Sequence, residues 1–270
     1  MKIGFFDSGL GGLTVLKEAI ENEKLKGEIY YLGDNKNTPY GLKDENFVKK
    51  IVEKNIKSLI ECGCNPIVIA CNTATSLSIK ELREKYKDII FIGTEPAVKV
   101  ASDAYMHKKI LVLATSITIK QEKLLNLIDK LNIKNYVQLC AADKLVQFAE
   151  DINCNNLQKE VNDYIKELLS KYDLNEFSHI VLGCTHFPLF YENFKMVIKE
   201  LYPNCNINII DGAKGISINL IKHIKNINKD YDNETNTKVC IFLTKESETF
   251  KIRSRQILNN SKADIEYKLQ

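Results

Sequence analysis

A chain of 270 residues, 44% hydrophobic and 27% charged, is long enough to bury a sizeable core and has the composition of a globular protein. Its formal net charge is only +3, and its lysines are scattered among acidic residues, which excludes a dedicated nucleic-acid surface. No apolar run approaches the roughly 20 residues of a membrane span, and the first residues, MKIGFFDSG, lack the apolar region of a signal peptide. We therefore expect a cytoplasmic protein with no membrane or nucleic-acid partner, whose eight cysteines stay reduced.

Short apolar runs rich in Ile, Val and Leu recur along the chain, and amphipathic stretches separate them. The stretch 45–61, for example, has apolar residues every three or four positions, which is typical of a helix. Strand–helix alternation with nearly continuous apolar runs predicts an α/β fold with doubly wound parallel sheets covered on both faces. The expected strands are 2–7, 28–34, 66–71, 89–94, 109–115, 136–141, 179–184, 207–211 and 238–244.

Two breaks in this alternation predict a division into two domains. Proline follows a strand at Glu95-Pro96, and glycine follows another at Asp211-Gly212. We expect an N-terminal α/β domain over 1–96, completed by the C-terminal segment 211–270, and a second α/β domain over 97–210. The stretch 224–237 is rich in Asn, Lys and Asp and is predicted to be a solvated loop.

Two segments repeat one chemical pattern, Ile-Val followed by small residues, a cysteine and polar groups. They are IVIACNTAT (67–75) and IVLGCTHFP (180–188), and their cysteines are Cys71 and Cys184. Each cysteine is expected at the carboxyl end of a strand and just before a helix, where open α/β sheets bind ligands. Helix N-termini carry unpaired N–H groups and a positive partial charge, so we expect this setting to favour thiolate over thiol.

Most of the other cysteines are expected to be packing residues, because free cysteine usually behaves as a small buried hydrophobe. A metal site is a weak alternative, suggested by Cys184-Thr185-His186 and by Cys62-Gly63-Cys64. The cysteine and histidine spacings of a zinc site are absent, so we expect no metal. The cysteines assigned to packing are Cys62, Cys140, Cys154, Cys205 and Cys240.

Two matched thiols suit a reaction that removes a proton from one face of a carbon and returns one to the other face. One thiol must be ionised while the other keeps its proton. A single covalent nucleophile, with His186 as its base, would leave the second cysteine unused. The pair therefore predicts a racemase or epimerase that needs no cofactor.

The first loop, DSGLGGLT (7–14), supports a small ligand more than a dinucleotide. Its glycines resemble GxGxxG, and Asp34 follows the second strand, but the third glycine of that motif is missing. We expect Asp7 and Ser8 to point into the crevice at the strand ends. The turn Pro39-Tyr40-Gly41 either presents backbone N–H groups there or is simply a turn.

A carboxylate of the substrate would be held by hydroxyls, amides and helix N-termini, since the three arginines lie outside these motifs. The candidates are Ser8, Asn72, Thr73, Thr75 and Thr185. Helix capping is the alternative role for Thr73 and Thr75. His186 and Asp7 are candidates to steer protons, although a histidine here can also be structural.

At these residues the sequence resembles the glutamate racemases, cofactor-independent enzymes that make D-glutamate for bacterial cell walls. The segments 114–121 and 139–150 depart from the family's pattern, but the matching segments span most of the chain. The matching segments are IGFFDSGLGGLTVL (3–16), YLGDNKNTPYG (31–41), VIACNTATS (68–76), GTEPAVKVA (93–101), VLGCTHFPL (181–189) and IIDGA (209–213).

The resemblance implies two facing Rossmann-like domains, related by pseudo-two-fold symmetry, with the active site between them, in a homodimer. It implies that Cys71 takes the proton from D-glutamate and Cys184 takes it from L-glutamate. Asp7, Glu150 and His186 match the assisting positions, although Glu150 can equally be a solvated helix-end carboxylate. The substrate-contacting positions are Asp7, Ser8, Pro39, Tyr40, Gly41, Asn72, Thr73, Thr75, Thr115, Thr118, Thr185 and His186.

Two other functions stay open at this point. A racemase of the same superfamily with broad specificity would differ only in its turnover of other amino acids. An amino-acid-binding or thiol-redox sensor could keep the fold without the reaction, because fold alone does not specify function. Binding alone, however, requires neither of the two strand-end cysteines.

Overall fold

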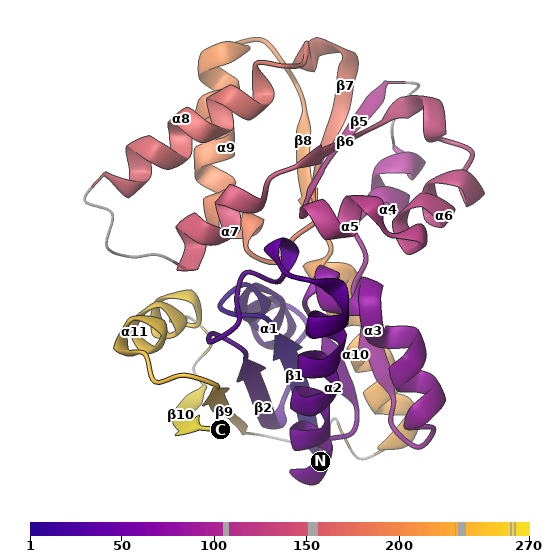
Figure 1. Cartoon of the computed structure of the whole chain (residues 1–270), viewed down its shortest axis with the longest axis vertical. Helices are drawn as coiled ribbons and strands as arrows, with labels where there is room; N and C mark the ends of the chain where they lie inside the picture. The colour runs from indigo at the N-terminus through magenta and orange to yellow at the C-terminus, as the bar shows by residue number, and fades with distance from the viewer. Residues whose placement is uncertain (105–107, 151–155, 230, 232–235, 260, 262) are drawn as a thin grey trace.

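The computed structural model of the chain describes residues 1–104, 108–150, 156–229, 231, 236–259, 261 and 263–270. Its strands form two separate parallel sheets, one of six strands and one of four, each covered by helices (Figure 1). We call the six-stranded sheet with its helices the first lobe and the four-stranded sheet with its helices the second lobe. This arrangement confirms the predicted fold class, an α/β protein with two parallel sheets.

The first sheet has the strand order β10-β9-β2-β1-β3-β4. The two C-terminal strands extend it beyond β2, with Gly27 paired to Thr237 in parallel register. β1 is buried from Ile3 to Asp7, which explains its continuous apolar run. The strands are β1 (Lys2–Asp7), β2 (Gly27–Gly33), β3 (Ile67–Ile69), β4 (Phe91–Gly93), β9 (Thr237–Leu243) and β10 (Asp264–Leu269).

Five helices cover the two faces of the first sheet, because each buries one apolar face on it. On one face α1 (Gly12–Glu21) packs against α10 (Ala213–Ile227) and α11 (Glu248–Ile257). On the other face α2 (Glu45–Glu61) packs against α3 (Asn72–Lys85). The observed α2 has the predicted bounds, and Asp44 caps it by accepting from the Phe47 amide.

The second sheet has the strand order β6-β5-β7-β8 and is likewise covered on both faces. Its strands are β5 (Lys109–Ala114), β6 (Val137–Ala141), β7 (Phe177–Leu182) and β8 (Asn208–Asp211). Its helices are α4 (Val98–Asp103), α5 (Ser116–Lys120), α6 (Glu122–Lys130), α7 (Asp143–Glu150), α8 (Leu157–Leu169) and α9 (Tyr191–Leu201). Short 3₁₀ turns η1 (Tyr40–Leu42), η2 (Lys134–Tyr136), η3 (Leu174–Glu176) and η4 (Phe187–Phe190) complete the described elements.

The chain crosses between the lobes in two places. It leaves the first sheet after β4 and enters α4, and it leaves the second sheet after β8 and enters α10. These crossings coincide with Glu95-Pro96 and Asp211-Gly212. The exact domain limits, 1–96 with 211–270 and 97–210, stay a prediction. Among the described helices, none has the length and apolar character needed to cross a lipid bilayer.

The sequence prediction needs two corrections in the C-terminal quarter. The stretch 224–237 is not entirely a loop, because α10 continues through Ile227 and β9 begins at Thr237; residues 230 and 232–235 lie outside the described part. The prediction also missed β10. Its alternation of charged and apolar residues, DIEYKL, is typical of a half-exposed strand, and it lies at the edge of the sheet.

Candidate active site

The loop that follows β1 is held in place by two hydrogen bonds at Gly9. Asp7 ends the strand, and its Oδ1 accepts from the Gly9 amide at 2.9 Å. The Gly9 carbonyl accepts from the Tyr31 hydroxyl at 2.6 Å. All four atoms are in buried residues, so each polar group has its partner inside the protein. The loop amides that follow are thereby directed towards the second lobe.

Glu150, the last described residue of α7, reaches this loop from the second lobe. Its Oε1 accepts from the Leu10 amide at 2.7 Å. A Cβ at Gly9 would lie only 1.9 Å from the same oxygen, so the contact requires a glycine. The solvated position considered for Glu150 from the sequence is therefore wrong.

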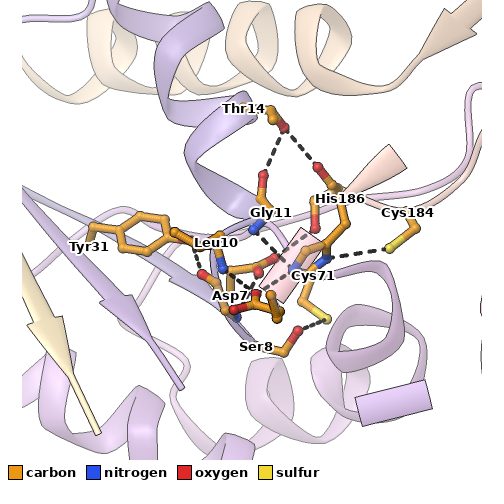
Figure 2. Close-up of polar contacts among 12 residues, drawn as sticks. Asp7, Ser8, Leu10, Gly11, Thr14, Tyr31, Cys71, Cys184 and His186 are labelled. Carbon is orange, nitrogen blue, oxygen red and sulfur yellow. Dashed lines mark hydrogen bonds and ion pairs between the residues drawn. The ribbon is translucent and has the colours of Figure 1, made fainter. Parts of the chain in front are cut away.

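His186 contacts Cys184 (Figure 2) and also Glu150, and so connects the two. Its Nε2 lies 2.7 Å from Glu150 Oε1, and its Nδ1 lies 3.7 Å from Cys184 Sγ. Burial lowers the pKa of His186, but the hydrogen bonds and charges of Cys184 and Glu150 raise it by a larger amount. The pKa of His186 therefore lies well above its ordinary value. The imidazolium form therefore has an anionic partner at Glu150 and a sulfur partner at Cys184.

Asp7 has a second partner in the second lobe. Its Oδ2 accepts from the Thr185 hydroxyl at 3.0 Å, and the Thr185 carbonyl accepts in turn from Thr14 at 3.2 Å. Asp7 is completely buried, and burial raises its pKa despite the nearby His186 charge. A fully buried carboxyl with a raised pKa at a strand end is characteristic of functional sites.

Cys71 caps the N-terminus of α3, where its Sγ accepts from the Ala74 amide at 3.4 Å. Its thiol donates towards Ser8 Oγ at 3.6 Å. The sequence predicted that the helix N-terminus would favour thiolate, and for Cys71 this is wrong. Burial and the neighbouring Asp7 raise the pKa of Cys71 to about 12, outweighing the Ala74 amide. Cys71 is therefore a thiol in this state of the protein.

Cys184 follows β7 in the second lobe, two positions after Leu182 and just before η4. It is 7% exposed, and Cys71 is 5% exposed. The two thiols are close enough that charge on Cys184 contributes to the raised pKa of Cys71. Figure 2 shows the Cys184 sulfur beside the His186 ring and the Cys71 sulfur beside Ser8. The structure thus brings the two predicted cysteines together, one from each lobe.

Three threonine hydroxyls meet where the lobes join. Thr73, in the first turn of α3, lies 2.9 Å from Thr115 Oγ1 and 3.5 Å from Thr118 Oγ1. Thr115 and Thr118 are themselves 2.9 Å apart at the N-terminus of α5. These three buried groups currently bond to one another, and each can turn to another acceptor.

The turn at Pro39, Tyr40 and Gly41 offers backbone rather than side-chain groups. The Tyr40 hydroxyl donates to Asp34 Oδ2 at 2.6 Å, and burial with the Asp34 charge raises the pKa of Tyr40 well above its ordinary value. Gly41 packs on the second lobe, since a Cβ there would lie 2.8 Å from Thr115 Cβ. Asp34 accepts the Tyr40 hydrogen bond and thus anchors the turn.

Asn72 and Thr75 differ in their availability to a ligand. The buried Asn72 Oδ1 has no hydrogen-bond partner, which leaves a free acceptor beside Cys71. Thr75 instead donates to the Ile69 carbonyl at 2.9 Å and accepts from the Thr94 amide at 3.2 Å. Its hydroxyl supports the backbone, and the contact of Thr75 with a substrate stays a prediction.

The remaining cysteines do not gather into a site. Within the described residues, no group of three or more His, Cys, Asp or Glu side chains could hold a metal ion. Cys140 and Cys240 are buried, Cys62 and Cys205 are partly buried, and Cys154 lies outside the described residues. Sequence reasoning missed Tyr31 and Thr14, whose partners are backbone atoms that no motif indicates.

Two α/β lobes that each contribute a buried thiol to one polar site define a protein of the racemase class. The sequence model of the Asp/Glu/Hydantoin racemase family matches residues 15–215. The chain belongs to this family, and it is an isomerase.

The relatives carry a more specific name. The glutamate racemase of Halothermothrix orenii is 43% identical over 228 residues, which are 84% of this chain and 85% of the relative. A glutamate racemase isoform of Bacillus anthracis superposes with a TM-score of 0.83 at 28% identity, covering 99% of this chain and 96% of that one. The Francisella tularensis enzyme in complex with D-glutamate superposes with a TM-score of 0.81 at 25% identity, covering 100% and 96%. The resemblance seen in the sequence is confirmed.

Proposed function

We propose that the chain is a glutamate racemase that interconverts L- and D-glutamate by a two-base mechanism on Cys71 and Cys184. The observation that carries this proposal is the placement of two buried thiols, one from each lobe, beside a single polar site. The names of the relatives, and the D-glutamate complex of one structural neighbour, support glutamate as the substrate.

The polar groups of the site suit a zwitterionic dicarboxylate. The unpaired Asn72 Oδ1 provides an acceptor for an ammonium group. The hydroxyls of Thr73, Thr115 and Thr118 can exchange their mutual hydrogen bonds for bonds to a carboxylate. Because the thiols are almost fully buried, substrate access requires the lobes to separate, which breaks contacts such as that of Asp7 with Thr185.

In the direction from L to D, the Cys184 thiolate removes the α-proton of L-glutamate and becomes a thiol. The resulting carbanion takes a proton from the Cys71 thiol on the opposite face, and Cys71 becomes the thiolate. The reverse direction exchanges these roles. Atoms and charge balance without another reactant, so we propose that the reaction needs no cofactor.

The neighbours of the two thiols favour this assignment of protons. Burial and Asp7 hold Cys71 as the thiol, which is the form that protonates the carbanion. His186, which is hydrogen-bonded to Glu150, lies 3.7 Å from Cys184 Sγ and is placed to exchange a proton with that sulfur. We assign Asp7, His186 and Glu150 to the control of proton location. Ser8, Pro39, Tyr40, Gly41 and Thr185 complete the proposed substrate surroundings.

The cellular role follows from the product. We propose a cytoplasmic homodimer that supplies D-glutamate for peptidoglycan synthesis, and thereby supports cell-wall growth and cell shape. Sedimentation equilibrium at micromolar protein concentration tests the dimer, and a monomer there contradicts it.

Incubation with L-glutamate in D₂O, without added cofactor, tests the reaction. We expect D-glutamate that carries deuterium at Cα, followed by NMR and chiral chromatography. If neither exchange nor the D-enantiomer forms, the proposed function is wrong. A panel of other amino acids measures specificity, and equal kcat/KM for aspartate or alanine would replace the glutamate assignment with a broad one.

A further inference from the structure

Asp143, the first residue of α7, forms hydrogen bonds with the start of a neighbouring helix. Both of its carboxylate oxygens lie 3.1 Å from the Ser116 amide nitrogen, and Oδ2 also accepts from the Ser116 hydroxyl. Ser116 is the first residue of α5. The Thr115 hydroxyl caps the same helix end by accepting from the Thr118 amide at 3.3 Å. Asp143 and Thr115 thus satisfy N–H groups that a helix start leaves unpaired.

α5 needs an anchor of this kind because it is only five residues long. Helices shorter than roughly 12 residues are marginal on their own, and packing has to hold them in place. Within α5 only Ile117 and Thr118 are buried, so its own core contact is small. A charge-assisted hydrogen bond from Asp143 is therefore a major determinant of where the helix begins.

The position of α5 determines the position of two hydroxyls of the site. Thr115 and Thr118 lie directly on either side of the anchored Ser116 and Ile117, and their hydroxyls bond to Thr73 of the first lobe. A shift of the helix start would move both hydroxyls away from Thr73. The threonine cluster is thus aligned indirectly by Asp143.

The same carboxylate also touches the turn from the first lobe. A Cβ at Gly41 would lie 2.4 Å from Asp143 Oδ1, so the Gly41 backbone packs directly against it. Asp143 therefore contacts both groups that border the threonine cluster, the α5 N-terminus and the η1 turn.

We propose that Asp143 is a positioning residue that aligns Thr115 and Thr118 to hold a carboxylate of the substrate. This inference rests on the proposed function for its substrate, but the anchoring of α5 does not. Asp143 touches neither thiol, so its loss changes binding more than proton transfer. The part of the substrate that it serves is common to both enantiomers, so both directions are affected alike.

Steady-state kinetics of Asp143→Ala and Asp143→Asn test the role in binding. We expect Asp143→Ala to raise KM for both L- and D-glutamate about tenfold, with kcat within about threefold of wild type. Asp143→Asn keeps an acceptor for the Ser116 amide, so its KM is expected to stay within about threefold. Asp129→Ala, at an exposed position on α6, is the control for loss of an aspartate. A KM unchanged in Asp143→Ala, or a loss confined to kcat, would overturn the proposal.

Hydrogen exchange of the 116–120 amides separates this inference from the proposed function. We expect about tenfold faster exchange in Asp143→Ala than in wild type, Asp143→Asn or Asp129→Ala. Unchanged exchange overturns the anchoring role, whether or not glutamate is the substrate. Faster exchange together with an unchanged KM overturns the link to the substrate carboxylate. A wild-type protein without racemase activity rejects the proposed function, while the exchange result still decides the anchoring of α5.

Discussion

The hydroxyl of Thr185 donates a hydrogen bond of 3.0 Å to Asp7, although the two residues belong to different lobes and lie 178 positions apart. Asp7 ends the central strand of one sheet, and Thr185 follows the last residue of a strand in the other by three positions. The carboxylate is completely buried. The two lobes therefore share one buried acidic group next to Cys71, and we expect its charge to influence both stability and activity.

Replacing Asp7 with asparagine is expected to lower activity without lowering stability. Burial raises the pKa of Asp7 in the folded state above its unfolded value of 3.8, so the ionised form costs stability, and this cost grows as pH rises through the folded pKa. Asparagine is neutral and keeps an oxygen for the Gly9 amide. We expect Asp7→Asn to unfold at an equal or higher denaturant concentration at pH 7, with racemisation reduced about 100-fold or more. A clear loss of stability at pH 7 would contradict this assignment.

Each cysteine is expected to be indispensable, but in a different way. Cys71→Ala and Cys184→Ala should each lower racemisation by about 1,000-fold or more. With L-glutamate in D₂O, Cys71→Ala keeps the base that removes the proton, so deuterium should enter only L-glutamate. Cys184→Ala should show the corresponding exchange only with D-glutamate. Chiral separation followed by mass spectrometry checks this, and racemisation at the native rate by either variant rejects the two-base mechanism.

The stabilising effect of His186 should depend on pH. Its pKa lies well above the unfolded value of 6.5, because Cys184 and Glu150 favour the charged form more than burial opposes it. The contribution of this raised pKa to stability is complete below pH 6.5 and is lost as pH rises through the folded pKa. The difference in unfolding free energy between wild type and His186→Gln should therefore shrink with rising pH. Glu150→Gln should weaken the same dependence, and a difference that grows with pH would contradict it.

Gly9 and Gly215 form a matched pair for testing close packing. Gly9→Ala places a Cβ 1.9 Å from Glu150 Oε1, so we expect a loss of about 1–3 kcal/mol of stability and most of the activity. Gly215 lies within α10 and has nothing within 4 Å of a Cβ. Gly215→Ala should therefore stabilise the protein by about 0.5–1 kcal/mol. Chemical denaturation of both variants measures the contrast, and equal effects would show that Glu150 moves freely.

Tyr31 is expected to support the loop after β1 through its hydroxyl alone. Tyr31→Phe leaves the buried Gly9 carbonyl without its 2.6 Å donor, which costs about 1–3 kcal/mol. Tyr30→Phe is the control, because the Tyr30 hydroxyl has only a 3.3 Å bond to Glu28 at the surface, and we expect a change within about 0.5 kcal/mol. Similar unfolding free energies for the two variants would remove Tyr31 from the support of the site.

Sequence patterns predicted the sheets and the two cysteines because local signals determine them. Buried strands such as β1 and β7 appear as continuous apolar runs, and Cys71 and Cys184 follow such runs directly. The pKa of Cys71 could not be predicted, because it depends on burial between two lobes rather than on the adjacent helix. The partners of Glu150 could not be predicted from the sequence either, because the Leu10 amide lies 140 positions away in the chain. β10 was missed although its alternation was visible.

Two carboxylates of α7 act on different parts of the site, Asp143 on the start of α5 and Glu150 on His186. Both lie in the helix, from its first residue to the last described one, so these contacts are separated by about 10 Å along its axis. Inserting or deleting one residue would rotate one end by about 100° relative to the other and detach one of the two carboxylates. Evolution and engineering can therefore vary the exposed side chains of α7, but the spacing between Asp143 and Glu150 has to remain constant.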